Sequence, residues 1–210
     1  MKYRYLGKSE LDVGPLTDFL KDTLVPLYED QSYRTMIHSL RTKESYQKGY
    51  PPVWLDQDWQ PEKNQAMKAS RYFWCLPLQN DLFVVGGQML SLKFPKVFGY
   101  ENQSSWSKCL NANLVKPQIL ISNQSSSIHV DTDRKSAVNT FLYNTDKSIT
   151  EYFSGDTVTD SFTYEEGDTY LLDTATPHRI NQQPNCTRLV LSWGYNIPFE
   201  KAVEALNDYQ

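Results

Sequence analysis

The chain has 210 residues, with 21 basic and 25 acidic side chains and a formal net charge of −4. This length suits one domain with a full hydrophobic core, so we expect residues 1–210 to form a single domain. The mild acidity excludes the basic stripe that is typical of nucleic-acid binders. No apolar run approaches the roughly 18 residues needed to cross a bilayer. With a mean hydropathy of −0.58, the sequence indicates a soluble protein without a nucleic-acid or membrane partner.

Three cysteines, Cys75, Cys109 and Cys186, are odd in number and show no C-x-x-C spacing. This pattern fits neither a disulfide framework nor a zinc ribbon. The first residues, Met1-Lys-Tyr-Arg-Tyr, are not followed by the apolar core of a signal peptide. We therefore expect a cytoplasmic protein.

The first 113 residues mix helical and extended patterns. Leu16, Phe19, Leu20 and Leu24 are spaced like one face of a short helix, and Pro15 suits its first turn. A second helix is expected over 30–40, a proline-rich loop over 51–61, and two strands, 82–88 and 89–94, around a Gly-Gly pair. We expect this part to pack on one face of the region that follows.

From about residue 114 the pattern becomes that of many short strands separated by turn residues. The predicted strands are 118–122, 127–130, 137–143, 149–153, 157–164, 169–172, 178–181 and 188–195. Their close, even spacing favours an antiparallel sandwich or barrel over 114–196. A closing helix is expected within 197–210, with Phe199, Val203 and Leu206 on one stripe.

Two of only three histidines lie in unusual settings. His129 and Asp131 are two residues apart at the end of a predicted strand, so both side chains leave the same face and can chelate a metal ion. His178 follows a Gly-Asp turn, an apolar strand and Pro177. Two imidazoles and one carboxylate form the facial triad that suits non-haem Fe(II) and leaves coordination positions open. The third histidine, His38, is expected at an exposed helical position.

Arg188 lies ten residues after His178 on an apolar strand. A cation fixed on a strand inside a barrel needs an anionic partner, and arginine binds a carboxylate through two parallel hydrogen bonds. Together these residues indicate a metal site with a carboxylate-binding group beside it.

The order and spacing of His129-Val-Asp131, His178 and Arg188 resemble the Fe(II)- and 2-oxoglutarate-dependent dioxygenase superfamily, over about residues 114–196. The resemblance implies a mainly β fold with flanking helices, a double-stranded β-helix or jelly roll related to the cupins. It also implies that His129, Asp131 and His178 hold Fe(II), that Arg188 binds the distal carboxylate of 2-oxoglutarate, and that O2 takes an open position. Succinate and carbon dioxide would be released.

The predicted strand 137–143 is expected to supply further residues that contact the co-substrate. Counted by twos, Asn139, Phe141 and Tyr143 share a face, and members of the superfamily use a polar or aromatic residue there to contact 2-oxoglutarate. Asn139 is the preferred candidate and Tyr143 the second. Arg134 and Lys135 follow the metal motif and either reach a substrate or bracket a turn.

The main hypothesis is an oxygenase, a hydroxylase that acts on a small molecule or a protein side chain. Two alternatives remain open. One is a cupin-like isomerase or hydrolase, because the same ligands hold Zn(II) or Mn(II) without redox chemistry. The other is a jelly-roll binding protein without catalysis. The sequence predicts neither the substrate nor the oligomeric state, because fold and motif do not transfer substrate identity.

Overall fold

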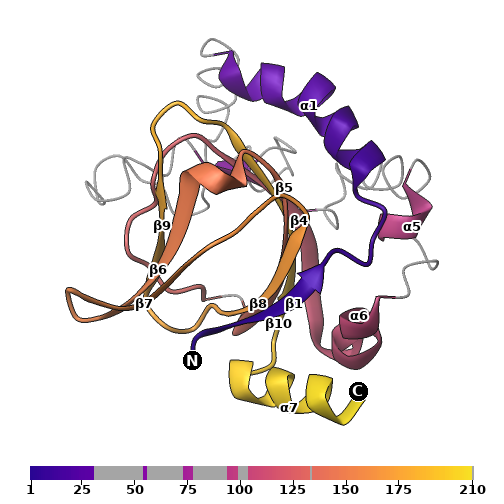
Figure 1. Ribbon diagram of the computed structural model, residues 1–210, viewed down its shortest axis with the longest axis vertical. Helices are drawn as coiled ribbons and strands as arrows, with labels where there is room; N and C mark the ends of the chain where they lie inside the picture. Colours follow the sequence, from indigo (N-terminus) through magenta and orange to yellow (C-terminus); the bar gives the residue numbers. More distant parts are fainter. Residues whose placement is uncertain (31–53, 56–72, 78–93, 99–103, 133, 210) are drawn as a thin grey trace, which may run out of the picture.

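The computed structural model describes residues 1–30, 54–55, 73–77, 94–98, 104–132 and 134–209 (Figure 1). Within these residues the protein is mainly β, with two antiparallel sheets and a few helices around them. The fold class predicted from the sequence is confirmed. No helix in these parts of the chain is both long and apolar enough to span a membrane.

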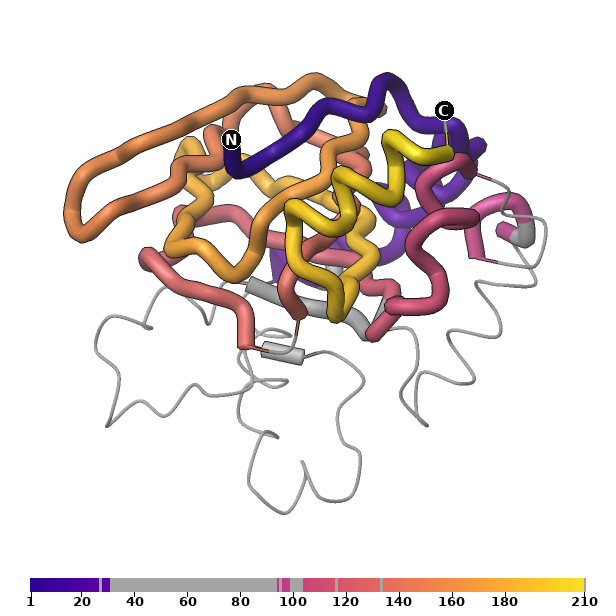
Figure 2. The backbone as a smooth tube through the Cα atoms, turned by 90° about the horizontal axis from the view of Figure 1, so that it is seen from below, coloured from indigo at the N-terminus to yellow at the C-terminus, as the bar shows by residue number. Residues whose placement is uncertain are grey.

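The larger sheet has seven strands in the order β1-β8-β5-β10-β4-β3-β2. They are β1 (Tyr3–Lys8), β2 (Trp54–Leu55), β3 (Phe73–Pro77), β4 (Leu114–Ser122), β5 (Ser136–Tyr143), β8 (Asp168–Asp173) and β10 (Arg188–Tyr195). The smaller sheet has the order β7-β6-β9 and consists of β6 (Ser148–Ser154), β7 (Thr157–Thr163) and β9 (His178–Gln182). The β6–β7 hairpin extends from the rest of the molecule (Figure 2).

From β4 onward the chain alternates between the two sheets. After β4 it joins the smaller sheet through an isolated bridge between His129 and His178, and it then returns to the larger sheet as β5. β6 and β7 lie in the smaller sheet, β8 in the larger, β9 in the smaller and β10 in the larger. This alternation is the winding of a double-stranded β-helix, and it encloses an interior between the two sheets.

Side-chain alternation along β10 divides the core in two. Val190 faces the interior and belongs to an inner cluster of buried side chains. Its members are Leu120, Phe141, Tyr152, Phe162, Tyr164, Leu172 and Val190. Leu189, Leu191 and Trp193 face the other way, into an outer cluster that includes Leu16, Trp106 and Leu206 from the helices. Each fully buried side chain of this size contributes about 1.5–3 kcal/mol to folding. β10 is therefore buried on both faces and fixes the residues that it directs inward.

The helices cover the outer face of the larger sheet (Figure 1). They are α1 (Gly14–Glu29), α5 (Pro95–Phe98), α6 (Ser105–Leu110) and α7 (Phe199–Tyr209), with 3₁₀ turns at Asn111–Asn113 and Thr145–Lys147. α1 and α7 confirm the predicted helices, and Pro15 stands in the first turn of α1 as expected. The single-domain organisation over 1–210 stays a prediction.

Several N-terminal expectations change. Trp54 and Leu55, expected within a loop, form β2 and pair with β3, because the Trp54–Leu55 backbone bonds to a neighbouring strand that the sequence pattern did not reveal. β1 and β3 were also not predicted. The helix expected over 30–40 lies outside the described residues beyond Asp30, and so do the strands 82–88 and 89–94 except for Phe94, which is neither strand nor helix.

Candidate metal centre

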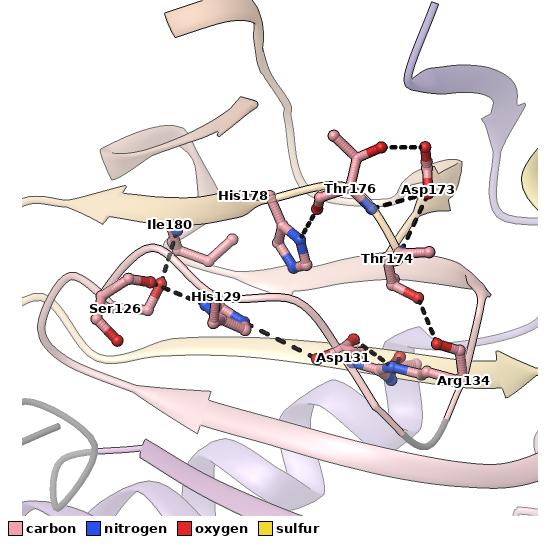
Figure 3. Close-up of polar contacts among 12 residues, drawn as sticks. Ser126, His129, Asp131, Arg134, Asp173, Thr174, Thr176, His178 and Ile180 are labelled. Carbon is pink, nitrogen blue, oxygen red and sulfur yellow. Dashed lines mark hydrogen bonds and ion pairs between the residues drawn. The ribbon is translucent and has the colours of Figure 1, made fainter. Parts of the chain in front are cut away.

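His129, Asp131 and His178 meet at the junction between the two sheets (Figure 3). The backbones of His129 and His178 exchange two N–H···O hydrogen bonds of 2.9 Å, which place the two rings side by side with centroids 4.5 Å apart. One potential ligand atom of each of the three residues lies within 4.8 Å of the others. The structure thus brings together the residues that the sequence predicts as ligands, while their metal-binding role stays a prediction.

Backbone carbonyls orient both imidazoles. Nδ1 of His129 lies 2.8 Å from the Ser127 carbonyl oxygen, and Nδ1 of His178 lies 2.8 Å from that of Thr176. A carbonyl can only accept a hydrogen bond, so in the neutral form of each ring Nδ1 carries the proton and Nε2 keeps the lone pair. Histidine ligands of metals typically have such a second hydrogen bond, which fixes the tautomer and the ring orientation.

Asp131 uses its two oxygens differently. Oδ2 accepts a hydrogen bond of 2.6 Å from Nε of Arg134, whereas Oδ1 faces His129 Nε2 at 3.9 Å. Burial raises the pKa of the Asp131 carboxyl, but Arg134 and the two imidazoles together hold it below its usual value. Asp131 is therefore a carboxylate with one oxygen occupied and one turned towards the histidines.

His178 is uncharged at neutral pH. Burial, followed by the adjacent His129, lowers the pKa of His178 to about 4. A neutral imidazole is the form that binds a metal ion. Two imidazoles with available Nε2 atoms and one carboxylate make a donor set that fits a divalent first-row metal ion.

A tight turn leads into the distal histidine. Oδ1 of Asp173 accepts hydrogen bonds from the backbone N–H groups of Ala175 (3.0 Å) and Thr176 (3.2 Å), and Oδ2 accepts from the Thr176 hydroxyl (2.7 Å). Lys2 also donates to Oδ2 over 3.2 Å. Thr176 in turn offers the carbonyl that orients His178, so Asp173 shapes the turn that leads into this ligand (Figure 3).

Arg188 begins β10 and is only 3% exposed. Its Nη1 donates to the Tyr164 hydroxyl over 2.8 Å, while Nε is buried without a hydrogen-bond partner in the described part of the chain. Among the described residues no carboxylate lies within ion-pair distance of Arg188. A buried guanidinium group without an anion carries a large desolvation cost, so the interior beside Arg188 is electrostatically suited to a carboxylate ligand.

Other polar atoms in the interior also lack partners. Oδ1 of Asn139 is buried without a hydrogen bond to any described residue, and so are the hydroxyl oxygens of Ser148 and Thr150. Ser148 and Thr150 alternate with exposed Ile149 on β6 and share the face of Tyr152, which packs in the inner cluster. Buried polar groups normally find partners, so these atoms are suited to hydrogen bonds with a polar ligand.

The shared face predicted for Asn139 and Tyr143 is wrong. A bulge in the pairing of β5 with β10 lets Leu189 pair with Tyr143 and Val190 with Phe141, so the alternation by twos ends before Tyr143. Tyr143 packs on the outer cluster, and Nζ of Lys21 from α1 lies 5.0 Å from its ring centroid. Asn139 stays on the inner side, opposite Ser192.

Sequence reasoning gave no role to Tyr164 and did not connect Arg134 to the ligands. Tyr164 follows β7, 24 residues before Arg188, and no local pattern signals that pairing. The sequence predicts that Arg134 either reaches a substrate or brackets a turn, and it does not predict the contact with Asp131. Its contact with Asp131, three residues earlier, has a local signal in the Asp-x-x-Arg spacing, which suits an ion pair within a loop.

Comparisons with known proteins give structural similarities only. No protein-family model and no curated protein matches the chain. A solved oxidoreductase of the 2OG-Fe(II) oxygenase family from Burkholderia pseudomallei is 14% identical, with a TM-score of 0.39, over 59% of this chain and 66% of that one. An oxalate decarboxylase from Lactobacillus farciminis is 12% identical, with a TM-score of 0.36, over 60% and 30%. A cupin domain from Bordetella pertussis is 10% identical, with a TM-score of 0.32, over 40% and 83%.

The matched part spans less than two thirds of the oxygenase and under a third of the decarboxylase. Similarity at this level says nothing of this chain's activity, substrate or metal.

Proposed function

We propose that the protein is an Fe(II)- and 2-oxoglutarate-dependent oxygenase that hydroxylates a small molecule or a protein side chain. The observation that carries the proposal is the combination of two features of one interior. A set of potential ligand atoms from His129, Asp131 and His178 lies at the sheet junction, and Arg188 is buried on the inward face of β10 without an anionic partner among the described residues.

In this proposal each residue has one task. Nε2 of His129, Nε2 of His178 and Oδ1 of Asp131 would hold the iron, and three such protein ligands would leave other coordination positions open to a co-substrate. Arg188, supported by Tyr164, binds the distal carboxylate of 2-oxoglutarate, and Asn139 supplies a further polar contact. When bound, the iron supplies oxidation of a C–H bond by O2, coupled to conversion of 2-oxoglutarate into succinate and carbon dioxide.

The inner cluster serves the same chemistry by excluding water. Phe141 stacks on Tyr164 with ring centroids 3.6 Å apart, and Phe162 packs on Tyr3 at 4.1 Å. Of these rings, Tyr164 contacts Arg188 directly. A dry wall strengthens the attraction between the guanidinium group and a carboxylate, and it limits side reactions of an oxidising centre.

The test combines binding and turnover. Under anaerobic conditions Fe(II) and 2-oxoglutarate together should produce a weak visible charge-transfer band, and admission of O2 should release succinate. His129→Ala should lose metal and band, whereas Arg188→Met should keep the metal but bind 2-oxoglutarate weakly. His38→Ala, which alters the one remaining histidine of the sequence, is the control.

Two results would contradict the proposal. One is metal binding without a band at saturating 2-oxoglutarate, which would favour a redox-inert cupin-like enzyme. The other is succinate release that is unchanged by Arg188→Met.

A further inference from the structure

Arg134 has a second connection besides Asp131. Its Nη1 donates to the Ser192 hydroxyl on β10 over 3.0 Å, and its carbonyl oxygen accepts from the Thr174 hydroxyl over 3.3 Å. The Arg134 side chain is 11% exposed. The guanidinium group is therefore tied to β10 and to the Asp131 carboxylate, while the Arg134 backbone is tied to the loop before His178 (Figure 3).

Gly194 provides the space for this side chain. A Cβ atom at position 194 would lie 2.8 Å from Cδ of Arg134 and 3.5 Å from its Cβ. Gly194 does not have the positive φ that favours glycine, unlike Gly155 and Gly167. Glycine at position 194 is thus explained by the Arg134 side chain, which crosses β10 there, and not by a backbone conformation that requires glycine.

We propose that Arg134 is a positioning residue that makes Asp131 a ligand through one oxygen only. Gly194 leaves the space that the Arg134 side chain occupies. The inference rests on the proposed metal site and adds a role that the ligands alone do not explain. A carboxylate can bind a metal ion through one or both oxygens. Because Oδ2 of Asp131 is held at 2.6 Å by a charge-assisted hydrogen bond, only Oδ1 is available to the ion.

The consequence concerns the number of open coordination positions. A second oxygen from Asp131 would take one of the three positions that the proposed reaction needs for a chelating co-substrate and O2. Arg134 is suited to prevent this because its planar group is fixed by Ser192 on one side and Asp131 on the other.

The experiment uses Mn(II) alone as the probe and counts its exchangeable waters by the broadening of its electron paramagnetic resonance lines in ¹⁷O-enriched water. In Arg134→Met, which keeps the stem but removes the donors, bound Mn(II) should lose one water relative to the native protein. Arg134→Lys keeps a donor and should restore that water. Arg179→Met is the matched control, because Arg179 also forms a 2.6 Å ion pair, with Glu151, and stands next to His178 without contacting a ligand oxygen.

Gly194→Ala tests the same inference without removing Arg134. It replaces Arg134→Met as the test if that variant does not fold. The added methyl group should displace Arg134 and cost the same water, and it should add nothing in an Arg134→Met background. An unchanged water count in both Arg134→Met and Gly194→Ala overturns the positioning role while leaving the metal site intact. Failure of the native protein to bind Mn(II) overturns the metal site itself, and this result is distinct from an absence of succinate release.

Discussion

Nη1 of Arg188 and the hydroxyl of Tyr164 lie 2.8 Å apart in the interior, and they join the first residue of β10 to the residue that follows β7. The Tyr164 hydroxyl accepts this hydrogen bond, so its own proton remains available to an acceptor beside Arg188. The ring of Tyr164 is held by stacking on Phe141 and by an edge contact with Phe162. The two sheets thus present one composite donor group to the interior.

Tyr164→Phe should weaken binding of 2-oxoglutarate, because the variant removes the partner of a buried cation and a donor to the bound carboxylate. Hydrogen bonds to charged groups contribute about 1.5–3 kcal/mol, so the dissociation constant should rise roughly tenfold to a hundredfold. Titration calorimetry with metal-loaded protein measures this. Tyr170→Phe, at a ring that packs against the inner cluster, is the matched control, and equal affinities for both variants would remove Tyr164 from the site.

The bulge in β5 leads to opposite expectations for two residues of one strand. Asn139→Ala should raise the dissociation constant of 2-oxoglutarate by roughly fivefold, corresponding to about 1 kcal/mol for a neutral hydrogen bond. Tyr143→Phe should leave it unchanged, because Tyr143 packs on the outer cluster beneath α1. The reverse order of effects would show that Tyr143, and not Asn139, contacts the co-substrate.

Asp173→Ala should affect both stability and the metal centre. Loss of the carboxylate leaves the N–H groups of Ala175 and Thr176 without their acceptor, at a cost of about 1–3 kcal/mol. Misplacement of the Thr176 carbonyl should also weaken metal binding about 10- to 100-fold through His178. Urea unfolding and Mn(II) titration measure the two effects. Asp156→Ala, at an exposed turn, is the control. An Asp173→Ala protein with native metal affinity would show that this turn does not position His178 for metal binding.

Metal binding should stabilise the native state, because the ligands converge only in the folded protein. At a metal concentration about a hundredfold above the dissociation constant, the free energy of unfolding should rise by about 2.7 kcal/mol, and a chelator should reverse the rise. His178→Ala should abolish the effect in thermal unfolding with and without Mn(II). A comparable rise in that variant would place the stabilising metal elsewhere.

Asp168 should make stability depend on acid pH. Burial raises the pKa of its carboxyl, but hydrogen bonds from Lys8, the Glu165 backbone N–H and Tyr5 outweigh this and hold the pKa below its usual value. A carboxyl with a lowered folded-state pKa stabilises the protein above its unfolded-state pKa of about 4, and the contribution is lost as the pH falls through the folded-state value. Asp168→Asn should therefore be less stable than the native protein at neutral pH, with a difference that shrinks in acid. A pH-independent difference in urea unfolding would contradict this.

Local sequence patterns predicted much of the β-core because strand periodicity and turn residues act over a few neighbouring positions. The strands from β4 to β10 match seven of the eight strands predicted from residue 114 onward to within a few residues, and α1 and α7 match the predicted helices. The eighth predicted strand, 127–130, is wrong, because only His129 pairs there, through an isolated bridge to His178. The same locality explains the failures. β1 and β3 are strands only because β8 and β4 lie beside them, and Tyr143 leaves the inner face only because β10 pairs with a bulge.

The sequence by itself determined which residue types carry the candidate chemistry, since two of only three histidines, one aspartate and one arginine stand at a meaningful spacing. Only the tertiary structure decided how they are held. The proximity of Arg134 to Gly194 and of Arg188 to Tyr164 depends on the register between strands far apart in the chain. Such contacts follow from burial and hydrogen bonding across sheets, and no local pattern encodes which side chains will meet there.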